Sequence, residues 1–281
     1  MTGWDSAIGG WCQSLRAAGL SPATIYQRRW QVGLVAAAYP NQSPWTVSGD
    51  QLVAFMANRG WGPEALHSAR SALRGFYSWG LDAGRTDRDP SRALRRVRLP
   101  RHLPRPAADL VVSNALEHAN DKIRLMILLG ALAGLRAAEI AKLRWDSIDG
   151  AAMTVCGKGG RTRRIPVHPA LAAELAAEYT RRADGRTGSG YRYTHHGDVY
   201  VFPGQTAGGM HPGHVSHALS MALGPGVTGH QLRHRAATRA LRGTGNLRAV
   251  QEFLGHSSPS TTAIYTEVDP AALLAAVMAT G

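Results

Sequence analysis

Apolar residues recur at helical spacing through most of the first hundred positions. Ser21 followed by Pro22 is typical of a helix start, because serine caps free backbone N–H groups and proline suits the first turn. Helices are predicted at about 22–39, 49–58 and 63–83. The first part of the chain is therefore expected to form a domain of four or five helices. In the longest of them, the core-facing positions are Leu66, Ala69, Leu73, Phe76 and Gly80.

Helical periodicity also marks the start of the second part of the chain. Residues 109–133 are largely apolar at helical spacing and lead into the segment AGLRAAEIAKLRW. Arg136 and Glu139 lie three residues apart in that segment, so they share a helix face and can form an ion pair. The core-facing positions of the segment are Leu135, Ile140 and Leu143.

A hairpin follows this helical region. Two short strands are predicted at 153–155 and 163–167, because their residues are typical of strands. The glycine-rich run 157–160 between them predicts a turn with Lys158 at its tip. This run lacks the spacing of a phosphate-binding GxxxxGKS or GxxxxGKT loop, so nucleotide hydrolysis is not supported.

Helices return near the end of the chain. The sequence HQLRHRAATRAL predicts a helix with His230, Arg233 and His234 on one side. The sequence GNLRAVQEFLGHSS predicts a second helix that ends at Gly255, with His256 directly after it. A third helix is expected to start at residues 258–259.

The last residues continue this helical pattern. Tyr265 lies two turns into the helix that starts at 258–259, a position where a tyrosine usually packs. Residues 270–279 are rich in alanine and leucine and predict a helix too apolar to be stable in water by itself. This helix is therefore expected to pack against another protein surface.

The amino-acid composition limits the classes of function that the chain can have. It has 32 Lys and Arg against 19 Asp and Glu, a formal charge of +13, and 44 % hydrophobic residues, which excludes a disordered basic tail. We find no apolar run long enough to span a membrane and no secretory signal, so a cytoplasmic protein is expected. Two cysteines cannot build a disulfide framework. The strong positive charge indicates nucleic acid as the partner.

The positive charge is concentrated in residues 92–105, which contain six arginines, no acidic residue and several prolines. Such a sequence is typical of an extended linker, either a solvated hinge or a segment that follows a phosphate backbone, and we favour the second. The expected division is a helical DNA-binding domain at 1–91, a linker at 92–106 and a catalytic domain at 107–281. The expected DNA contacts are His67, Arg70 and Arg74 on the helix at 63–83, and Arg92, Arg95, Arg96, Arg98, Arg101 and Arg105 in the linker.

A histidine group offers a competing interpretation as a zinc site. His211, His214 and His217 are spaced three residues apart, with His195 and His196 upstream. Positions i, i+3 and i+6 drift around a helix, and no cysteine or acidic ligand lies nearby in sequence. No metal site is therefore expected, and these histidines are assigned to the surface or to phosphate contacts.

Four segments in order resemble the catalytic domain of the tyrosine recombinase (phage integrase) family over residues 106–269. The segments are AGLRAAEI, GKGGRTRRIPV, HQLRH and LGHSSPSTTAIY. The first 91 residues are similar to the helical core-binding domain of that family in length, position and helical pattern. The resemblance implies a mostly α fold with a small antiparallel β-sheet, in which a core-binding domain precedes an α+β catalytic domain. The implied catalytic residues are Arg136, Lys158, His230, Arg233, His256 and Tyr265.

The resemblance also implies a role for each catalytic residue. Tyr265 would attack the scissile phosphate, giving a 3′-phosphotyrosyl link and a free 5′-hydroxyl. Arg136 and Arg233 would bind the non-bridging oxygens, and Lys158 would protonate the leaving 5′-oxygen.

The remaining polar residues of the four segments would assist this reaction. His230 would accept the tyrosine proton or bind a phosphate oxygen, and His256 would be a second hydrogen-bond donor to the phosphate. Glu139 would orient Arg136. Because these cations are part of the chain, the resemblance implies no cofactor, neither Mg²⁺ nor ATP.

The family implies an assembly as well as a reaction. The protein is expected to be a monomer in solution and a homo-tetramer on two DNA duplexes that carry a core attachment site, with a directionality factor as a further partner and no membrane partner. Because helices are predicted from the first residues, it is expected to be a simple integrase without an arm-binding domain. The helix at 270–279 packs on its own domain or on a neighbouring protomer, and both arrangements stay open.

Three other functions compete with a phage integrase. A Xer-like resolvase of chromosome or plasmid dimers has the same architecture. A type IB topoisomerase shares the chemistry but acts as a monomer, which the apolar C-terminal helix disfavours. A DNA-binding regulator that never cuts is disfavoured by the complete catalytic set.

Overall fold

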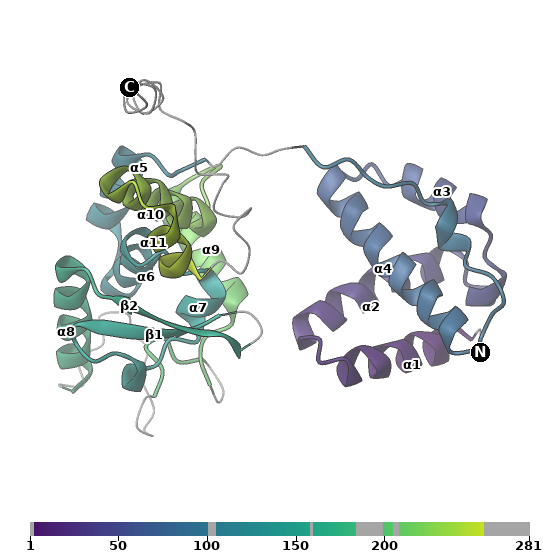
Figure 1. Ribbon diagram of the computed structural model, residues 1–281, viewed down its shortest axis with the longest axis horizontal. Coiled ribbons are helices and arrows are strands. Elements are labelled where there is room, and N and C mark those ends of the chain that lie inside the picture. The colour runs from purple at the N-terminus through teal and green to yellow at the C-terminus, as the bar shows by residue number, and fades with distance from the viewer. Residues whose placement is uncertain (1–2, 101–104, 158–159, 184–198, 205–207, 256–281) are drawn as a thin grey trace, which may run out of the picture. The chain divides into compact units, whose positions relative to one another are not determined.

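The computed structural model describes residues 3–100, 105–157, 160–183, 199–204 and 208–255 (Figure 1). The chain divides into two compact units, Met1–His102 and Leu103–Gly281. The boundary between them falls inside the stretch 92–106. Within the described residues, no helix is both long enough and apolar enough to cross a membrane.

The first unit is helical, and its helix starts follow the local sequence. Ser21 caps the second helix by accepting a hydrogen bond from the backbone N–H of Thr24. Ser48 and Gln51 form a reciprocal capping box at the third. The predicted helices at 22–39, 49–58 and 63–83 are confirmed. The elements are α1 (Trp4–Ala17), α2 (Pro22–Ala38), η1 (Pro44–Thr46), α3 (Gly49–Ala57), α4 (Pro63–Asp82) and η2 (Pro90–Ala93).

Aromatic rings form the centre of the first unit. Phe76 of α4 is fully buried, and four tryptophans surround it: Trp4, Trp11, Trp45 and Trp79. Its ring stacks on Trp45 with a centroid distance of 5.3 Å and meets Trp11 edge-on at 5.5 Å. Trp4 stacks at 6.1 Å. Because these rings come from α1, η1 and α4, they join the N-terminus of the chain to the longest helix of the unit.

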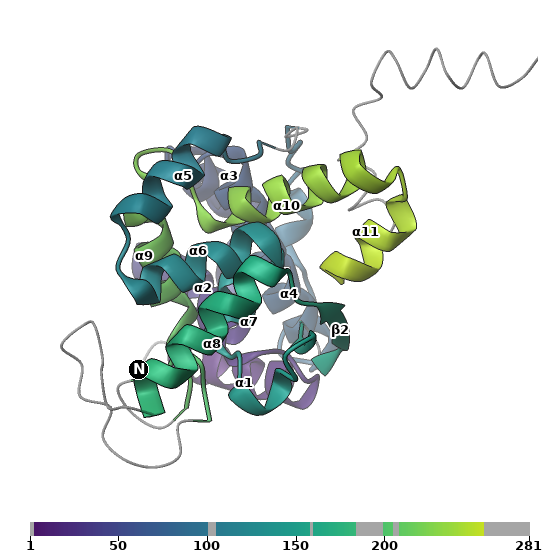
Figure 2. The same ribbon diagram turned by 90° about the vertical axis from the view of Figure 1, so that its left-hand side faces the viewer.

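The described part of the second unit is mostly helical with one antiparallel pair of strands, as expected (Figures 1 and 2). The apolar stretch 109–133 is two helices rather than one, because the chain leaves helical geometry at Ala119 and Asn120 caps a new helix. The elements are α5 (Asp109–His118), α6 (Asp121–Leu132), α7 (Ala137–Ala141), η3 (Trp145–Ser147), β1 (Ala152–Cys156), β2 (Thr162–Pro166), α8 (Pro169–Ala183), α9 (Pro212–Leu223), α10 (Gly229–Thr244) and α11 (Leu247–Leu254).

Helix α6 is the centre of the second unit. It packs against α5, α7, α8, α9 and α10, and residues 125–131 are all buried. Its apolar side chains are therefore covered on every side, which explains the near-continuous run LMILLGA. Gly130 lets α10 come close, because a Cβ there would lie 2.9 Å from a methyl group of Leu232. The expected core positions Leu135, Ile140 and Leu143 are buried as well.

Strands β1 and β2 form a hairpin whose two faces differ. Met153 pairs with Ile165, and both side chains are buried against the helices. Val155 pairs with Arg163, so the side chain of Arg163 points to the same inner face. The next residue, Arg164, points outward and forms an ion pair with exposed Asp149. Alternation along β2 therefore sends one of two adjacent arginines into the protein and the other into solvent.

Replacement of Gly80 by alanine is expected to destabilise the first unit. A Cβ at Gly80 would overlap the ring of Trp45, which packs against Phe76 and Trp79. Overpacking of this kind costs about 1–3 kcal/mol. The free energy of unfolding in urea measures the loss.

A matched control comes from another helical glycine. No heavy atom lies within 4 Å of a Cβ built on Gly33 in α2. Gly33→Ala should therefore raise stability by about 0.5–1 kcal/mol, the difference in helix propensity. Equal effects of the two replacements would show that Trp45 does not restrict position 80.

Candidate active site: three arginines around a buried carboxylate

Glu139 is the centre of the site, and the local sequence places it there. Helix α7 begins after Arg136, and Glu139 is the third residue of the helix. Its Oε2 accepts a hydrogen bond from the backbone N–H of Arg136 at 2.9 Å, and its Oε1 accepts one from Nη1 of Arg136 at 2.9 Å. The predicted Arg136–Glu139 pair is therefore confirmed. The Glu139 side chain is only 4 % exposed, so it needs further partners.

Two more arginines from distant parts of the chain supply these partners. Arg163 of β2 binds both carboxylate oxygens of Glu139, with Nη1–Oε1 and Nη2–Oε2 distances of 3.0 Å. Arg233 of α10 brings its Nη1 to 3.7 Å from Oε2 of the same carboxylate. One carboxylate thus joins the start of α7, the hairpin and α10.

The net charge of this cluster, counted over the described residues, is positive. Burial by itself would raise the pKa of Glu139, but hydrogen bonds from Arg163 and the Arg136 backbone, with the charges of Arg163 and Arg233, keep that pKa below its ordinary value. Glu139 is therefore ionised, yet it balances only one of three guanidinium charges. A phosphate at the surface of the cluster would be attracted to the excess.

The three guanidinium groups differ in exposure. The side chain of Arg136 is 38 % exposed, and within the described residues its guanidinium makes one hydrogen bond, to Glu139. Arg233 is 1 % exposed, and its Nη1 and Nη2 donate to the backbone carbonyls of Gly134 and Leu254 at 2.5 and 2.6 Å. The two arginines predicted to act as equals on a phosphate therefore have different environments here.

Two histidines of α10 lie beside Arg233. His230 is exposed, His234 is half-buried, and their ring centroids are 4.3 Å apart. Desolvation and the charges of Arg233 and Arg136 lower the pKa of His230 below 6.5. Desolvation, His230 and Arg233 lower the pKa of His234 to about 4. His230 is therefore neutral at pH 7 and can accept a proton.

The other expected catalytic residues lie outside the described residues: Lys158, His256 and Tyr265. The segments on either side of them are described. Residues 152–157 and 160–166 form the hairpin around 158–159, and α11 ends at Gly255, directly before His256. The αL conformation of Gly255, with φ of +66°, confirms the predicted helix end.

Arg163 is the member of the cluster that sequence analysis missed. Its position in the run RTRR gave no reason to separate it from Arg161 or Arg164. The available signal was the alternation of β2, because Ile165 is an apolar core residue and Arg163 lies two positions before it on the same face.

The expected DNA contacts of the first unit have mixed environments. Arg70 is half-buried, and its Nε donates to the carbonyl of Leu94 at 3.0 Å, so it binds the start of the basic linker to α4. His67 is half-buried, and its Nδ1 has no hydrogen-bond partner in the described part of the chain. Arg74 is half-buried as well.

The linker arginines are more accessible. Arg92 lies 3.8 Å from Asp89 and its side chain is 73 % exposed. The other described members are exposed, and Arg101 lies outside the described residues. The exposed set is Arg95, Arg96, Arg98 and Arg105.

The histidines considered as zinc ligands have separate positions. His211 caps α9 by accepting a hydrogen bond from the backbone N–H of Gly213. Its ring is 5.8 Å from that of His214, and His214 and His217 are exposed on α9. His195 and His196 lie outside the described residues.

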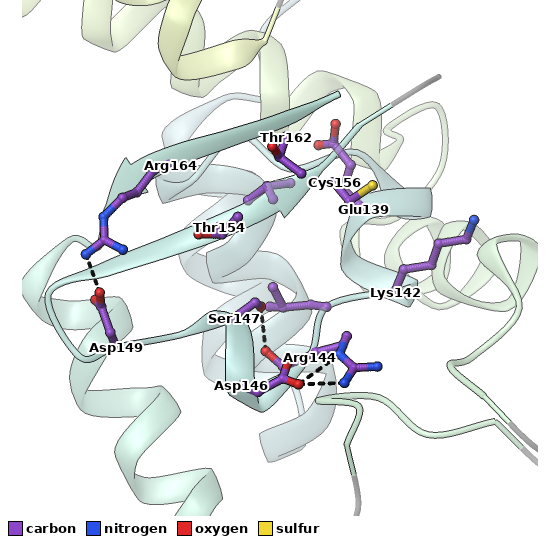
Figure 3. A pocket seen from close by; sticks show the side chains of 12 residues that line it. Glu139, Lys142, Arg144, Asp146, Ser147, Asp149, Thr154, Cys156, Thr162 and Arg164 are labelled. Atoms are coloured by element: carbon purple, nitrogen blue, oxygen red, sulfur yellow. Dashed lines mark hydrogen bonds and ion pairs between the residues drawn. The ribbon is translucent and has the colours of Figure 1, made fainter. Parts of the chain in front are cut away.

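A cavity of about 430 Å³ lies on the outer face of the hairpin (Figure 3). Glu139 and Cys156 line one end of it, and Lys142 extends from its edge. Both of its arginines form ion pairs, Arg144 with Asp146 and Arg164 with Asp149. The cavity therefore lacks the excess positive charge of the arginine cluster.

Comparison with known proteins identifies the family of the chain. The model of the phage integrase family matches residues 109–272, more than half of the chain. Tyrosine recombinase XerC of Xanthomonas campestris pv. campestris (strain B100) is 36 % identical over 223 residues, 75 % of this chain and 66 % of that protein, slightly less than two thirds of its length. XerC of Xylella fastidiosa (strain M23) is 32 % identical over 269 residues, 89 % of this chain and 88 % of that protein.

Solved structures share the fold. A lambda integrase dimer bound to a COC′ core site matches with a TM-score of 0.72 at 18 % identity, over 94 % of this chain and 77 % of that chain. The XerH site-specific recombinase bound to difH substrate matches with a TM-score of 0.66 at 20 % identity, over 96 % and 83 %. The family model and the relatives named XerC place the chain in the class of the tyrosine recombinases, and the solved structures share its fold. The chain belongs to the phage integrase family.

Replacement of Glu139 by glutamine is expected to destabilise the protein by about 3 kcal/mol at neutral pH. The change removes the carboxylate charge that pairs with largely buried Arg163 and fully buried Arg233. The lowered pKa of Glu139 also means that its stabilisation is present above the ordinary carboxyl pKa and is lost as the pH falls. Urea unfolding between pH 7 and pH 4 should therefore show a smaller acid loss for Glu139→Gln than for the wild type.

Glu252→Gln is the matched control for this change. Glu252 pairs with Arg248 on the surface of α11, where both side chains are mostly exposed. An exposed pair of this kind contributes less than about 0.5 kcal/mol. A Glu139 variant as mild as this control would contradict the central position of the carboxylate.

Proposed function

We propose that the protein is a site-specific recombinase that cuts and rejoins DNA through a 3′-phosphotyrosyl intermediate, with Tyr265 as the nucleophile. The observation that carries this proposal is the cluster of three arginines around one carboxylate, in a chain that belongs to the phage integrase family. An excess of fixed guanidinium charge suits a reaction in which negative charge collects on phosphate oxygens.

The chemistry conserves the energy of the phosphodiester bond. The phenolic oxygen of Tyr265 attacks the phosphorus, a P–O bond to the tyrosine forms, and the bond to the 5′-oxygen breaks. The second strand transfer reverses these steps with a different 5′-hydroxyl. No nucleotide hydrolysis is needed, because one phosphodiester is exchanged for another. Arg136, the most exposed arginine of the cluster, is the first contact for a non-bridging oxygen.

Proton transfers are assigned to the remaining residues. Lys158 donates a proton to the leaving 5′-oxygen. His230 accepts the tyrosine proton, and its lowered pKa supports this role because the ring is neutral at pH 7. His256 donates a hydrogen bond to the phosphate, and Arg233 binds it together with Arg136. No metal ion or ATP takes part in these steps.

The substrate is a double-stranded DNA core site, bound by the first unit and the basic linker. Exposed Arg95, Arg96, Arg98 and Arg105 supply phosphate contacts, so binding should weaken steeply with salt. The protein works as a homo-tetramer on two duplexes in the cytoplasm of a bacterial host, with a directionality factor as a further partner.

A dimer resolvase of the Xer type is the second candidate. The relative from Xylella fastidiosa that aligns over 89 % of this chain is named XerC. Resolution of chromosome or plasmid dimers uses the same chemistry and differs only in the DNA site. Recombination of minimal core duplexes from a candidate attachment site and from a chromosomal dimer site separates the two functions.

Tyr265→Phe tests the nucleophile. This variant should bind core DNA with unchanged affinity and form no covalent adduct, because it lacks the phenolic oxygen. A nicked suicide duplex, from which the short fragment with the free 5′-hydroxyl diffuses away after cleavage, traps the adduct for gel analysis. A phenylalanine variant that still traps DNA would overturn the assignment.

Lys158 and Arg136 should respond differently to a better leaving group. Replacement of the 5′-bridging oxygen by sulfur removes the need for a proton, so Lys158→Ala should recover most of its cleavage rate. Arg136→Ala should stay slow, because its charge acts on the non-bridging oxygens. Recovery of both variants, or of neither, contradicts this division of roles.

A further inference from the structure

Arg163 has an environment that differs from that of every other arginine in the hairpin. Its side chain is 11 % exposed, and three of its N–H groups have protein acceptors. Nη1 and Nη2 bind the two oxygens of Glu139 at 3.0 Å, and Nε donates to the backbone carbonyl of Phe253 at 2.9 Å. One planar group therefore joins β2, α7 and the last turn of α11.

Arg163 contacts α11 at its C-terminal end, where backbone carbonyls lack partners within the helix. The last carbonyls of a helix have no partner within the helix and carry partial negative charge. Arg163 binds the carbonyl of Phe253, and Arg233 binds that of Leu254 at 2.6 Å. Two arginines that share Glu139 thus fix two consecutive carbonyls at the end of α11. Figure 2 shows α11 beside β2, with which it is in contact.

Two glycines make this approach possible. A Cβ on Gly255 would lie 2.8 Å from Cδ of Arg163, and the φ of +66° there also favours glycine. On the other side, a Cβ on Gly134 would lie 2.8 Å from a methyl group of Leu254. The end of α11 is therefore packed directly between Arg163 and the segment that leads to Arg136.

Only an arginine can make this set of contacts. The guanidinium has five N–H donors in a rigid fork, so it can bind both oxygens of a carboxylate and a carbonyl on its third side. Lysine keeps the charge but offers a single ammonium, which cannot reach the three acceptors in these directions. A change from arginine to lysine therefore removes the geometry and retains the charge.

We propose that Arg163 is a positioning residue for DNA cleavage, because its guanidinium fixes the end of α11 against Glu139 and hence against Arg136. The inference rests on the proposed function, in which His256 and Tyr265 follow α11 in the chain. Arg163 does not contact the phosphate. It fixes the end of α11, from which the chain continues to the nucleophile, relative to the arginine that binds the phosphate.

The experiment compares Arg163→Lys with Arg164→Lys. The two residues are adjacent in β2, and Arg164 lies on the outer face in an exposed ion pair with Asp149. The measurements are the single-turnover rate of covalent adduct formation on a nicked suicide duplex at saturating protein, the Kd for the same duplex, and the thermal melt of each variant.

Arg163→Lys should form the adduct about 10- to 100-fold more slowly, since a displacement of about 1 Å at a reacting group can cost 100-fold. Its Kd should stay within about twofold of the wild type, because the charge is retained and DNA contacts lie elsewhere. Arg164→Lys should match the wild type in both. A rate for Arg163→Lys within twofold of the wild type, or a loss seen only in Kd, overturns the inference.

A second substrate separates positioning from phosphate contact. A methylphosphonate at the scissile position has lost one negative oxygen, so it needs less cationic stabilisation. Arg136→Ala should recover on this substrate relative to the wild type, whereas Arg163→Lys should keep its full deficit. Equal recovery of the two variants would make Arg163 a phosphate ligand and would overturn its assignment as a positioning residue.

Two further controls complete the test. Should Arg163→Lys not fold, Gly255→Ala replaces it, because the added Cβ pushes the Arg163 side chain away from α11. Gly255→Ala should also lower the rate of adduct formation and leave the Kd unchanged. A wild-type rate for this variant contradicts the inference. The wild type and Tyr265→Phe are measured in the same assay, as the positive and negative controls for adduct formation. Absence of an adduct with the wild type rejects the proposed function itself, whereas a wild-type adduct with a normal Arg163→Lys rate rejects the inference alone.

Discussion

The arrangement of the catalytic unit depends on the burial of one carboxylate. Removal of Glu139 from water is costly unless its charge is paired and its oxygens accept several hydrogen bonds. Arg136, Arg163 and Arg233 meet this requirement, and each comes from a different element. None of these elements can shift without breaking a contact with the same carboxylate, so α7, the hairpin and α10 fix one another. A cluster that binds phosphate with several cations, as proposed for this one, would gain its geometry in this way.

Backbone carbonyls extend this constraint to the end of α11. Arg233 bonds to Gly134 and Leu254, and Arg163 bonds to Phe253, so the arginines that surround Glu139 also bind the chain before α7 and after α11. Mutual repulsion among three guanidinium groups is reduced because each has oxygen acceptors close by. The same groups therefore stabilise the fold and produce the positive potential of the site, and a change in one of them affects both.

The sequence patterns predicted the features that depend on interactions between residues close together in the sequence. The i, i+3 spacing gave the Arg136–Glu139 pair, the two short strand-like runs around the glycine-rich turn gave the hairpin, and Gly255 gave the end of α11. The break between α5 and α6 was not predicted, although the polar run EHANDK around Asn120, which caps α6, marks it in the sequence. Neither was the role of Arg163. Its partners lie 24 and 90 positions away in sequence, and contacts at such separation follow from packing that no periodicity describes.

The difference between arginine and lysine gives a final physical reason for this arrangement. A guanidinium that shares a buried carboxylate stays charged at every pH at which the protein is folded, and its fork makes it a fixed donor rather than a proton source. Proton donation needs a group whose pKa can approach the working pH, and an ammonium meets that need. Among 32 basic residues only Lys122, Lys142 and Lys158 are lysines, and Lys158 alone lies in the hairpin turn beside the cluster in sequence. In the proposed function, a lysine that donates the proton and arginines that stabilise the charge would allow acid catalysis and charge stabilisation to be adjusted independently.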